Sequence, residues 1–299
     1  MATVNRWLVT GAAGMLGQEV CEALTEAGHA VLPLARTDLD LTHPGAVTRT
    51  LHRARPSVVV NCAAWTDVDA AEHAEADALR INGAGVRTLA RACATVGARL
   101  LHVSTDYVFA GDTDVSRAED AAPDPRTAYG RTKLAGERAV LEELPHLGTV
   151  VRTGWLYGRH GPNFVTTVLR KAAAGERVRV VDDQHGQPTW ARDVAEALIG
   201  LGTLPDRLAR GVFHATSAGR TTWHGLARHV YRAAGADPGL VDACSTAELG
   251  RPAPRPAHSH LSHHRWALTG LPAPRAWEDA LEAALPALGV PPVPAARHH

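Results

Sequence analysis

The sequence has no excess of charge of either sign, and this balance argues against two classes of partner. Its 31 lysine and arginine residues match its 31 aspartate and glutamate residues, so the formal net charge is zero. Proteins that bind nucleic acid or an acidic membrane surface usually carry a basic excess. Neither partner is therefore expected, whereas a phosphorylated small molecule needs only a local group of donors.

Cysteines and long apolar runs are also scarce. The chain has only four cysteines, which form no CxxC pair and indicate free thiols in a reducing compartment: Cys21, Cys62, Cys93 and Cys244. No run reaches the roughly 18 apolar residues that a membrane-spanning helix needs, and residues 1–7 lack the apolar core of a signal peptide. We therefore expect a soluble, cytoplasmic protein.

Apolar runs alternate with helical patterns through the first half of the chain. Strands are predicted at 6–10, 30–34, 57–62, 99–104 and 149–153, and helices at 16–27, 44–55, 74–96 and 127–144. This alternation is typical of βαβ units, and the run SVVVNC at 57–62 is apolar enough for a sheet that is covered on both faces. The predicted fold class is α/β, a doubly wound parallel sheet of the Rossmann type.

The alternation of strand and helix patterns becomes less regular after residue 155. We expect a helix at 163–174, a strand at 178–181, a helix at 191–201 and a proline-rich loop at 243–256. The predicted organisation is a dinucleotide-binding Rossmann domain at 1–155. Residues 156–299 are expected to form mostly a smaller, less regular substrate-binding lobe, with some segments returning to the main domain.

Three glycines follow the first predicted strand at GxxGxxG spacing. Gly11 permits the tight turn, Gly14 lets the backbone approach a phosphate, and Gly17 allows close packing of helix against strand. The N-terminus of the helix that follows offers free N–H groups to a pyrophosphate. The pattern predicts a dinucleotide site, and the alternative is a glycine-rich turn that binds nothing.

The residues after the second predicted strand bear on the choice of cofactor. Arg36 stands where NAD sites often carry an acid, and a basic residue there favours the 2′-phosphate of NADP(H). The alternative is a solvated arginine in a loop. Asp40 follows shortly and is expected near the adenine.

Thr105, Tyr129 and Lys133 form a catalytic pattern. Tyr129 and Lys133 are four residues apart, so a helix places them on one face. A nearby ammonium is expected to lower the pKa of the Tyr129 phenol, which is otherwise about 10, toward the neutral range. Thr105 ends the fourth predicted strand and can bond the same substrate oxygen. The alternative is that Tyr129 packs and Lys133 is an ordinary surface residue.

Together these motifs resemble the dTDP-4-dehydrorhamnose reductase family, within the extended short-chain dehydrogenase/reductase superfamily. The resemblance covers most of the chain and rests on seven segments in the family's order: 61–69 (NCAAWTDVD), 104–109 (STDYVF), 128–137 (AYGRTKLAGE), 152–157 (RTGWLY), 163–170 (NFVTTVLR), 183–189 (DQHGQPT) and 255–261 (RPAHSHL). Cys62, Trp65 and His258 depart from the family pattern near the pocket and bear on which sugar is bound.

The resemblance implies a role for each matching residue. The catalytic residues would be Thr105, Tyr129 and Lys133. The cofactor site would comprise Gly11, Gly14, Met15, Leu16, Gly17, Arg36, Asp40, Leu41, Ala63, Ala64, Thr66, Tyr129 and Lys133. The substrate site would comprise Val68, Thr105, Asp106, Trp155, Asn163, Gln187 and Arg255, the last three near the nucleotide diphosphate. Core packing is the alternative for Trp155, although its indole face suits a sugar.

The implied activity is reduction of the C4 ketone of a dTDP-linked 4-keto-6-deoxy sugar by NADPH, with NADH also possible. The main expectation is conversion of dTDP-4-dehydro-L-rhamnose to dTDP-L-rhamnose. One alternative is a related ketoreductase of antibiotic sugar pathways, for example of the dihydrostreptose type. Two others are a non-catalytic dinucleotide-binding regulatory subunit, against which the intact Thr105, Tyr129 and Lys133 weigh, and an epimerase with tightly held NAD.

The expectations for metal and assembly are brief. Four histidines cluster near the C-terminus, but their spacing matches no zinc pattern, so no metal site is predicted: His258, His260, His263 and His264. The resemblance implies a possible homodimer. Some relatives use magnesium in dimer contacts, but no carboxylates of this chain match those ligands, so a need for Mg²⁺ stays open.

Overall fold

A computed structural model describes residues 6–290, and its central feature is a sheet of six parallel strands. The spatial order is β10-β5-β4-β3-β1-β2, formed by β1 (Arg6–Thr10), β2 (Ala30–Leu34), β3 (Val58–Asn61), β4 (Arg99–Thr105), β5 (Gly148–Thr153) and β10 (Gly211–His214). Because the chain moves from β1 to one neighbour and then crosses to the other, the order reverses at β1. Ligands of such sheets bind at that switch point.

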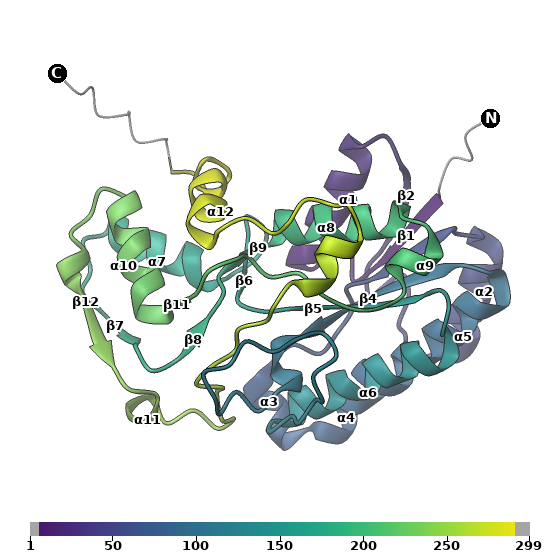
Figure 1. The fold of residues 1–299 in the computed structure, drawn as a ribbon, viewed down its shortest axis with the longest axis horizontal. Coiled ribbons are helices and arrows are strands. Elements are labelled where there is room, and N and C mark those ends of the chain that lie inside the picture. Colours follow the sequence, from purple (N-terminus) through teal and green to yellow (C-terminus); the bar gives the residue numbers. More distant parts are fainter. Residues whose placement is uncertain (1–5, 291–299) are drawn as a thin grey trace.

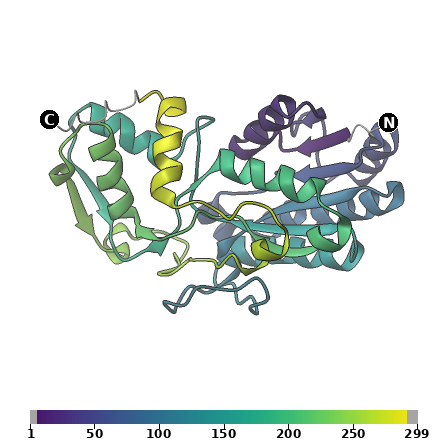
Figure 2. The same cartoon turned by 45° about the horizontal axis from the view of Figure 1, so that its top comes forward.

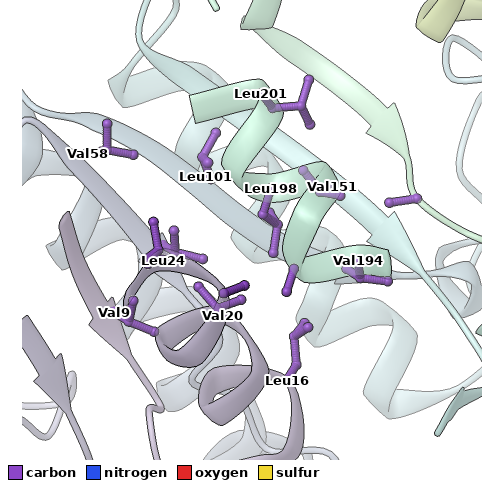
Figure 3. Packing of buried hydrophobic residues seen from close by; sticks show 14 of the residues in the cluster. Val9, Leu16, Val20, Leu24, Val58, Leu101, Val151, Val194, Leu198 and Leu201 are labelled. Atoms are coloured by element: carbon purple, nitrogen blue, oxygen red, sulfur yellow. The ribbon is translucent and has the colours of Figure 1, made fainter. Parts of the chain in front are cut away.

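Helices cover both faces of the sheet (Figure 1). On one face lie α1 (Met15–Glu26) and α8 (Ala191–Thr203), and on the other lie α2 (Pro44–Ala54), α5 (Val86–Val96) and α6 (Ala128–Glu143). Figure 3 shows Leu16, Val20 and Leu24 of α1 gathered with Val194 and Leu198 of α8 in one apolar cluster that also includes Val9 and Val151 of the strands. This double covering explains why β3 is buried along its whole length and begins with three consecutive valines, Val58, Val59 and Val60. The predicted doubly wound parallel sheet is confirmed.

One predicted helix differs in detail. The helix expected at 74–96 begins at Glu75 as α4 (Glu75–Leu79), widens into a π-helical turn, η1 (Arg80–Gly85), and continues as α5. Within this turn the Asn82 side chain bonds the backbone of Trp65: its Oδ1 accepts from the Trp65 N–H at 2.8 Å, and its Nδ2 donates to the Trp65 carbonyl at 3.1 Å. A short helix that was not predicted, α3 (Val68–His73), precedes it and is capped by Asp67.

The second lobe comprises α7 (Phe164–Ala173), β7 (Val178–Val181), α10 (Trp223–Ala233), β12 (Val241–Cys244) and α12 (Trp277–Ala284), which share their own apolar core. Figures 1 and 2 both place these elements at the end of the molecule away from β2. Shorter elements complete the chain: η2 (Asp106–Val108), β6 (Leu156–Tyr157), β8 (His185–Gly186), β9 (Thr189–Trp190), α9 (Asp206–Ala209), β11 (Thr221–Thr222), η3 (Pro238–Leu240), α11 (Thr246–Leu249), η4 (His264–Leu268) and η5 (Leu285–Leu288).

The loop predicted at 243–256 is only partly irregular. It contains the end of β12 and the helix α11, which Ser245 and Glu248 close with a reciprocal capping box. Both α8 and β10 belong to the layers of the main sheet although they follow residue 155. The domain limits at 155 and 156 stay a prediction, and the outer limits at 1 and 299 lie outside the described residues. No helix among residues 6–290 is long and apolar enough to cross a membrane.

Candidate active site

A cavity of about 590 Å³ opens at the carboxyl ends of β1, β3, β4 and β5. Most of the residues predicted for the site line it: Gly11, Gly14, Met15, Leu16, Gly17, Arg36, Asp40, Leu41, Ala63, Ala64, Thr66, Val68, Thr105, Asp106, Tyr129, Lys133 and Trp155. Further residues that the sequence reasoning did not assign also line it: Ala13, Leu39, Cys62, Ile81, Val103, Ser104, Tyr107, Thr153, Gly154 and Leu156. Most of the second group adjoin a predicted residue in the chain, which was the available signal.

The glycine turn is shaped so that side chains are excluded from it. Gly11 has φ +68°, and a Cβ there would lie 2.6 Å from the backbone N of Ala63. A Cβ on Gly17 would lie 2.2 Å from the carbonyl oxygen of Gly11. At Gly14, a Cβ would meet only that oxygen, at 3.3 Å, so its other side is open. The turn therefore presents bare backbone to the cavity, as a dinucleotide site requires.

The start of α1 fits an anion. Gly14 is the residue that caps α1, and no side chain accepts a hydrogen bond there. The first N–H groups of the helix thus stay available at the cavity wall, where the helix dipole favours negative charge. Residues of this turn would hold the pyrophosphate of a nicotinamide dinucleotide.

Thr105, Asp106 and Tyr129 meet in one part of the cavity. Thr105 is the last residue of β4, and its hydroxyl donates to Asp106 Oδ1 at 2.9 Å. Tyr129 lies in the first turn of α6, which starts there because the Thr127 side chain caps it through the N–H of Gly130 at 3.0 Å. The Tyr107 ring stands edge-on to the Tyr129 ring, with centroids 5.7 Å apart.

The pKa of Tyr129 differs from the sequence-based expectation. Burial raises the pKa of Tyr129 to about 12, and Lys133 does not lower it. Burial lowers the pKa of Lys133 to about 8, and its Nζ donates a hydrogen bond to the carbonyl of Val103 at 2.7 Å. The expected lowering of the Tyr129 pKa is therefore wrong, because desolvation of the buried phenol outweighs the hydrogen bond with Thr105 that acts to lower it. A protonated phenol is the form that a proton donor needs.

A buried ion pair lies behind this group. Arg152 of β5 holds Glu137 of α6 with two hydrogen bonds, Nε to Oε1 at 2.9 Å and Nη2 to Oε2 at 2.7 Å. The Ser104 hydroxyl donates to the same Oε1 at 2.6 Å. Both charged side chains are almost fully buried, at 3% and 2% exposed. The pair ties the helix that carries Tyr129 and Lys133 to the strands beneath it.

Trp155 lies in the cavity wall with an uncommon backbone conformation. Its φ is +50°, in the left-handed region that side chains other than glycine rarely adopt. The indole stacks on that of Trp223, with ring centroids 3.6 Å apart and planes 4° apart. Strained residues of this kind gather at functional sites, where the surroundings fix them. The wall position agrees with the predicted sugar contact, which stays a prediction.

Three predicted substrate residues are not part of the cavity wall. Asn163 caps α7, accepting from the N–H of Thr166 at 3.0 Å. Gln187 is 5% exposed, and its side chain bonds Ser217, Thr216 and Leu261. In the structure, Asn163 therefore caps a helix and Gln187 joins three segments through buried hydrogen bonds.

Arg255 is the third of these residues. It donates to Asp69 Oδ2 of α3 at 2.9 Å, which joins its loop to the cavity side of the main domain. The substrate roles of Asn163, Gln187 and Arg255 remain predictions.

The clustered histidines separate into two groups. His258 and His260 lie beside Asp114, with potential ligand atoms within 4.8 Å of one another. The guanidinium of Arg220 already bonds Asp114 and approaches His260 Nε2 to 3.1 Å. His263 instead contacts Thr216 at 2.9 Å. Because the positive charge of Arg220 already pairs with Asp114, a metal cation is disfavoured at this position. The prediction of no metal site remains untested.

Raising the pH is expected to weaken the folded protein through Asp106. Burial raises the pKa of Asp106 to about 6 from 3.8, so its contribution to the free energy of unfolding is complete below pH 3.8 and is lost as pH rises through about 6. The wild type should lose about 3 kcal/mol relative to Asp106→Asn across this range. Urea unfolding of both proteins at several pH values measures the difference, and a constant difference would contradict the expectation.

The sheet, the glycine turn after β1 and the cavity with Thr105, Tyr129 and Lys133 define an extended short-chain dehydrogenase/reductase. The sequence profile of the RmlD substrate binding domain matches residues 5–289, and the chain belongs to this family.

Reductases of dTDP-linked sugars are similar to this protein along nearly the whole chain. The dTDP-4-dehydrorhamnose reductase of Streptomyces griseus is 52% identical over 285 residues, which cover 95% of this chain and 94% of that protein. The dTDP-4-keto-6-deoxy-D-glucose reductase of Streptomyces niveus is 48% identical, with 95% and 98% covered. The crystal structure of dTDP-4-dehydrorhamnose reductase from Bacillus anthracis in complex with NADP has a TM-score of 0.88 at 35% identity, covering 94% and 98%.

Proposed function

We propose that this protein reduces the C4 ketone of dTDP-4-dehydro-L-rhamnose to dTDP-L-rhamnose. The observation that carries the proposal is a single cavity that joins the bare glycine turn to Thr105, Tyr129 and Lys133. A dinucleotide at the turn and a ketone beside Tyr129 would therefore occupy one continuous space. The relatives named as dTDP-sugar reductases support the choice of substrate class.

The residues of the cavity have distinct tasks in this proposal. When bound, the reduced nicotinamide supplies the hydride. Tyr129, whose pKa of about 12 keeps it protonated at neutral pH, gives its proton to the alkoxide that forms. Asp106, which accepts from the Thr105 hydroxyl in the structure, holds that side chain at the cavity. The hydroxyl would donate to the same substrate oxygen once its proton turns from Asp106 to the substrate. Lys133 binds the nicotinamide ribose and lowers the cost of a phenolate once its ammonium turns toward Tyr129.

Replacing Arg36 by alanine is expected to weaken the preference for NADPH. Arg36 lines the cavity near the predicted adenosine end, is largely exposed, and lies 3.8 Å from Asp40. Loss of its charge-assisted bonds to the 2′-phosphate should raise the KM for NADPH about tenfold, as for a charged hydrogen bond worth roughly 1.5 kcal/mol. The KM for NADH should change little. Steady-state kinetics with both cofactors test this, with Arg53→Ala on exposed α2 surface as control.

The substrate test uses NADPH absorbance with dTDP-4-dehydro-6-deoxyglucose, with and without a 3,5-epimerase. Oxidation only when the epimerase is present supports the L-configured ketone. Oxidation without the epimerase favours the second candidate, a ketoreductase for the D-sugar. This candidate is supported by the 48% identity to the dTDP-4-keto-6-deoxy-D-glucose reductase of Streptomyces niveus. No oxidation with NADPH or NADH in either mixture would contradict both and favour the regulatory-subunit alternative.

A further inference from the structure

The Trp155 indole is held in a socket formed by α10 of the second lobe and by β8, which pairs with the strand β11 directly before α10. One part of the socket is the stacked Trp223, the first residue of α10. Another is Gly186 of β8, where a Cβ would lie 2.2 Å from Trp155 Cε2, so only a residue without a side chain fits against the indole. The carbonyl of Trp155 also accepts from the N–H of Thr189 at 3.1 Å.

The socket is itself supported by contacts within the second lobe. The Trp223 Nε1 donates to Gln184 Oε1 at 3.1 Å, and Gln184 Nε2 donates to Thr246 at 2.8 Å. Phe164, which follows the cap of α7, lies against the Trp223 ring with centroids 4.6 Å apart. The Trp223 indole is therefore held by the hydrogen bond of its Nε1 to Gln184 and by contact with the Phe164 ring, and one of its ring faces stacks on Trp155.

Trp155 adjoins the catalytic group through its neighbour in the chain. A Cβ on Gly154 would lie 2.6 Å from Asp106 Oδ2, so the Asp106 carboxylate lies close against the backbone of Gly154. Asp106 in turn bonds the Thr105 hydroxyl. The strained Trp155 thus stands where the reacting end of a substrate would lie, rather than at the glycine turn.

We propose that Trp223 and Gly186 are positioning residues that hold the Trp155 indole against the sugar of the substrate. The inference rests on the proposed function, because it needs a sugar beside Thr105. A left-handed residue is costly to maintain and persists only where its surroundings fix it. Removing the stacked partner releases the indole, so the second lobe sets the affinity for the sugar, while the glycine turn of the main domain holds the dinucleotide.

The test compares dTDP-L-rhamnose with dTDP, by calorimetry on protein saturated with NADP. Trp223→Leu is expected to lower the affinity for dTDP-L-rhamnose about 3- to 10-fold, the range for loss of an aromatic pair. The affinities for dTDP and NADP should not change. The KM for the keto sugar should rise by the same factor with kcat unchanged. Trp223→Phe, which keeps a ring, should restore most of the affinity.

Gly186→Ala provides an independent variant that leaves Trp223 in place. Its methyl group displaces the indole from the socket, so the same selective loss for the sugar nucleotide is expected. Trp277→Phe, another tryptophan of the second lobe core, is the control and should bind both nucleotides as the wild type does.

Two results would overturn the inference. One is wild-type affinity for dTDP-L-rhamnose in Trp223→Leu or in Gly186→Ala. The other is a parallel loss of dTDP and NADP, which indicates general damage to the lobe. A wild type that binds dTDP-L-rhamnose without oxidising NADPH contradicts the proposed function alone, whereas a wild type that binds dTDP-L-rhamnose no better than dTDP contradicts both.

Discussion

Tyr129→Phe is expected to lower kcat by about a hundred- to ten-thousandfold, the range for loss of a general acid. The phenol is the proton donor of the cavity, and burial keeps it protonated by raising its pKa to about 12. Phenylalanine preserves the ring and its edge-on contact with Tyr107, so the shape of the cavity should not change. NADPH oxidation with the keto sugar measures the loss, and calorimetry with NADPH should give nearly wild-type affinity.

Tyr107→Phe is the matched control for this expectation. Tyr107 lines the same cavity, with its ring centroid 5.7 Å from that of Tyr129. If Tyr129 alone delivers the proton, Tyr107→Phe should keep kcat within about tenfold of the wild type. Near-normal turnover in Tyr129→Phe, or equal losses in the two variants, would contradict the assignment of Tyr129.

The main sheet was predictable because each of its first five strands is an apolar run bounded by turn residues. β1, β2 and β7 begin and end as predicted, and most other bounds moved by a residue or two. The π-helical turn at Arg80–Gly85 was not predicted, because an apolar period of 3.6 residues carries no signal for a local widening of the helix or for the bond from Asn82 to the distant backbone of Trp65. β10 escaped because its four residues GVFH carry too little pattern to mark an element.

The cavity was predictable where spacing alone determines contact. The glycines follow a strand, and Tyr129 and Lys133 share a helix face, so local geometry brings them to one edge. The sequence could not show which tryptophan stacks on Trp155, because Trp223 lies far along the chain in another lobe. It also missed the direction of the Tyr129 pKa, which depends on burial created by the whole fold.

Arg152→Met is expected to lower the free energy of unfolding by about 3–5 kcal/mol, the range for breaking a buried ion pair. Arg152 and Glu137 come from two separate motifs that the sequence flagged for family likeness alone, and the structure joins them at the base of the site. Methionine removes the guanidinium and leaves the Glu137 carboxylate buried, with only the Ser104 hydroxyl to satisfy it. Urea unfolding measures the change.

Two comparisons separate a buried unpaired charge from the mere loss of an ion pair. Arg131 lies on the same helix as Glu137, α6, and forms an exposed ion pair with Glu75 of α4. Arg131→Met breaks this pair and should cost less than about 1 kcal/mol. Adding Glu137→Leu to Arg152→Met removes the stranded carboxylate, so the double variant should regain stability relative to Arg152→Met. A double variant that is less stable than either single variant would contradict this expectation. The main cost of Arg152→Met would then be the lost attraction within the pair, and not the burial of a carboxylate without its partner.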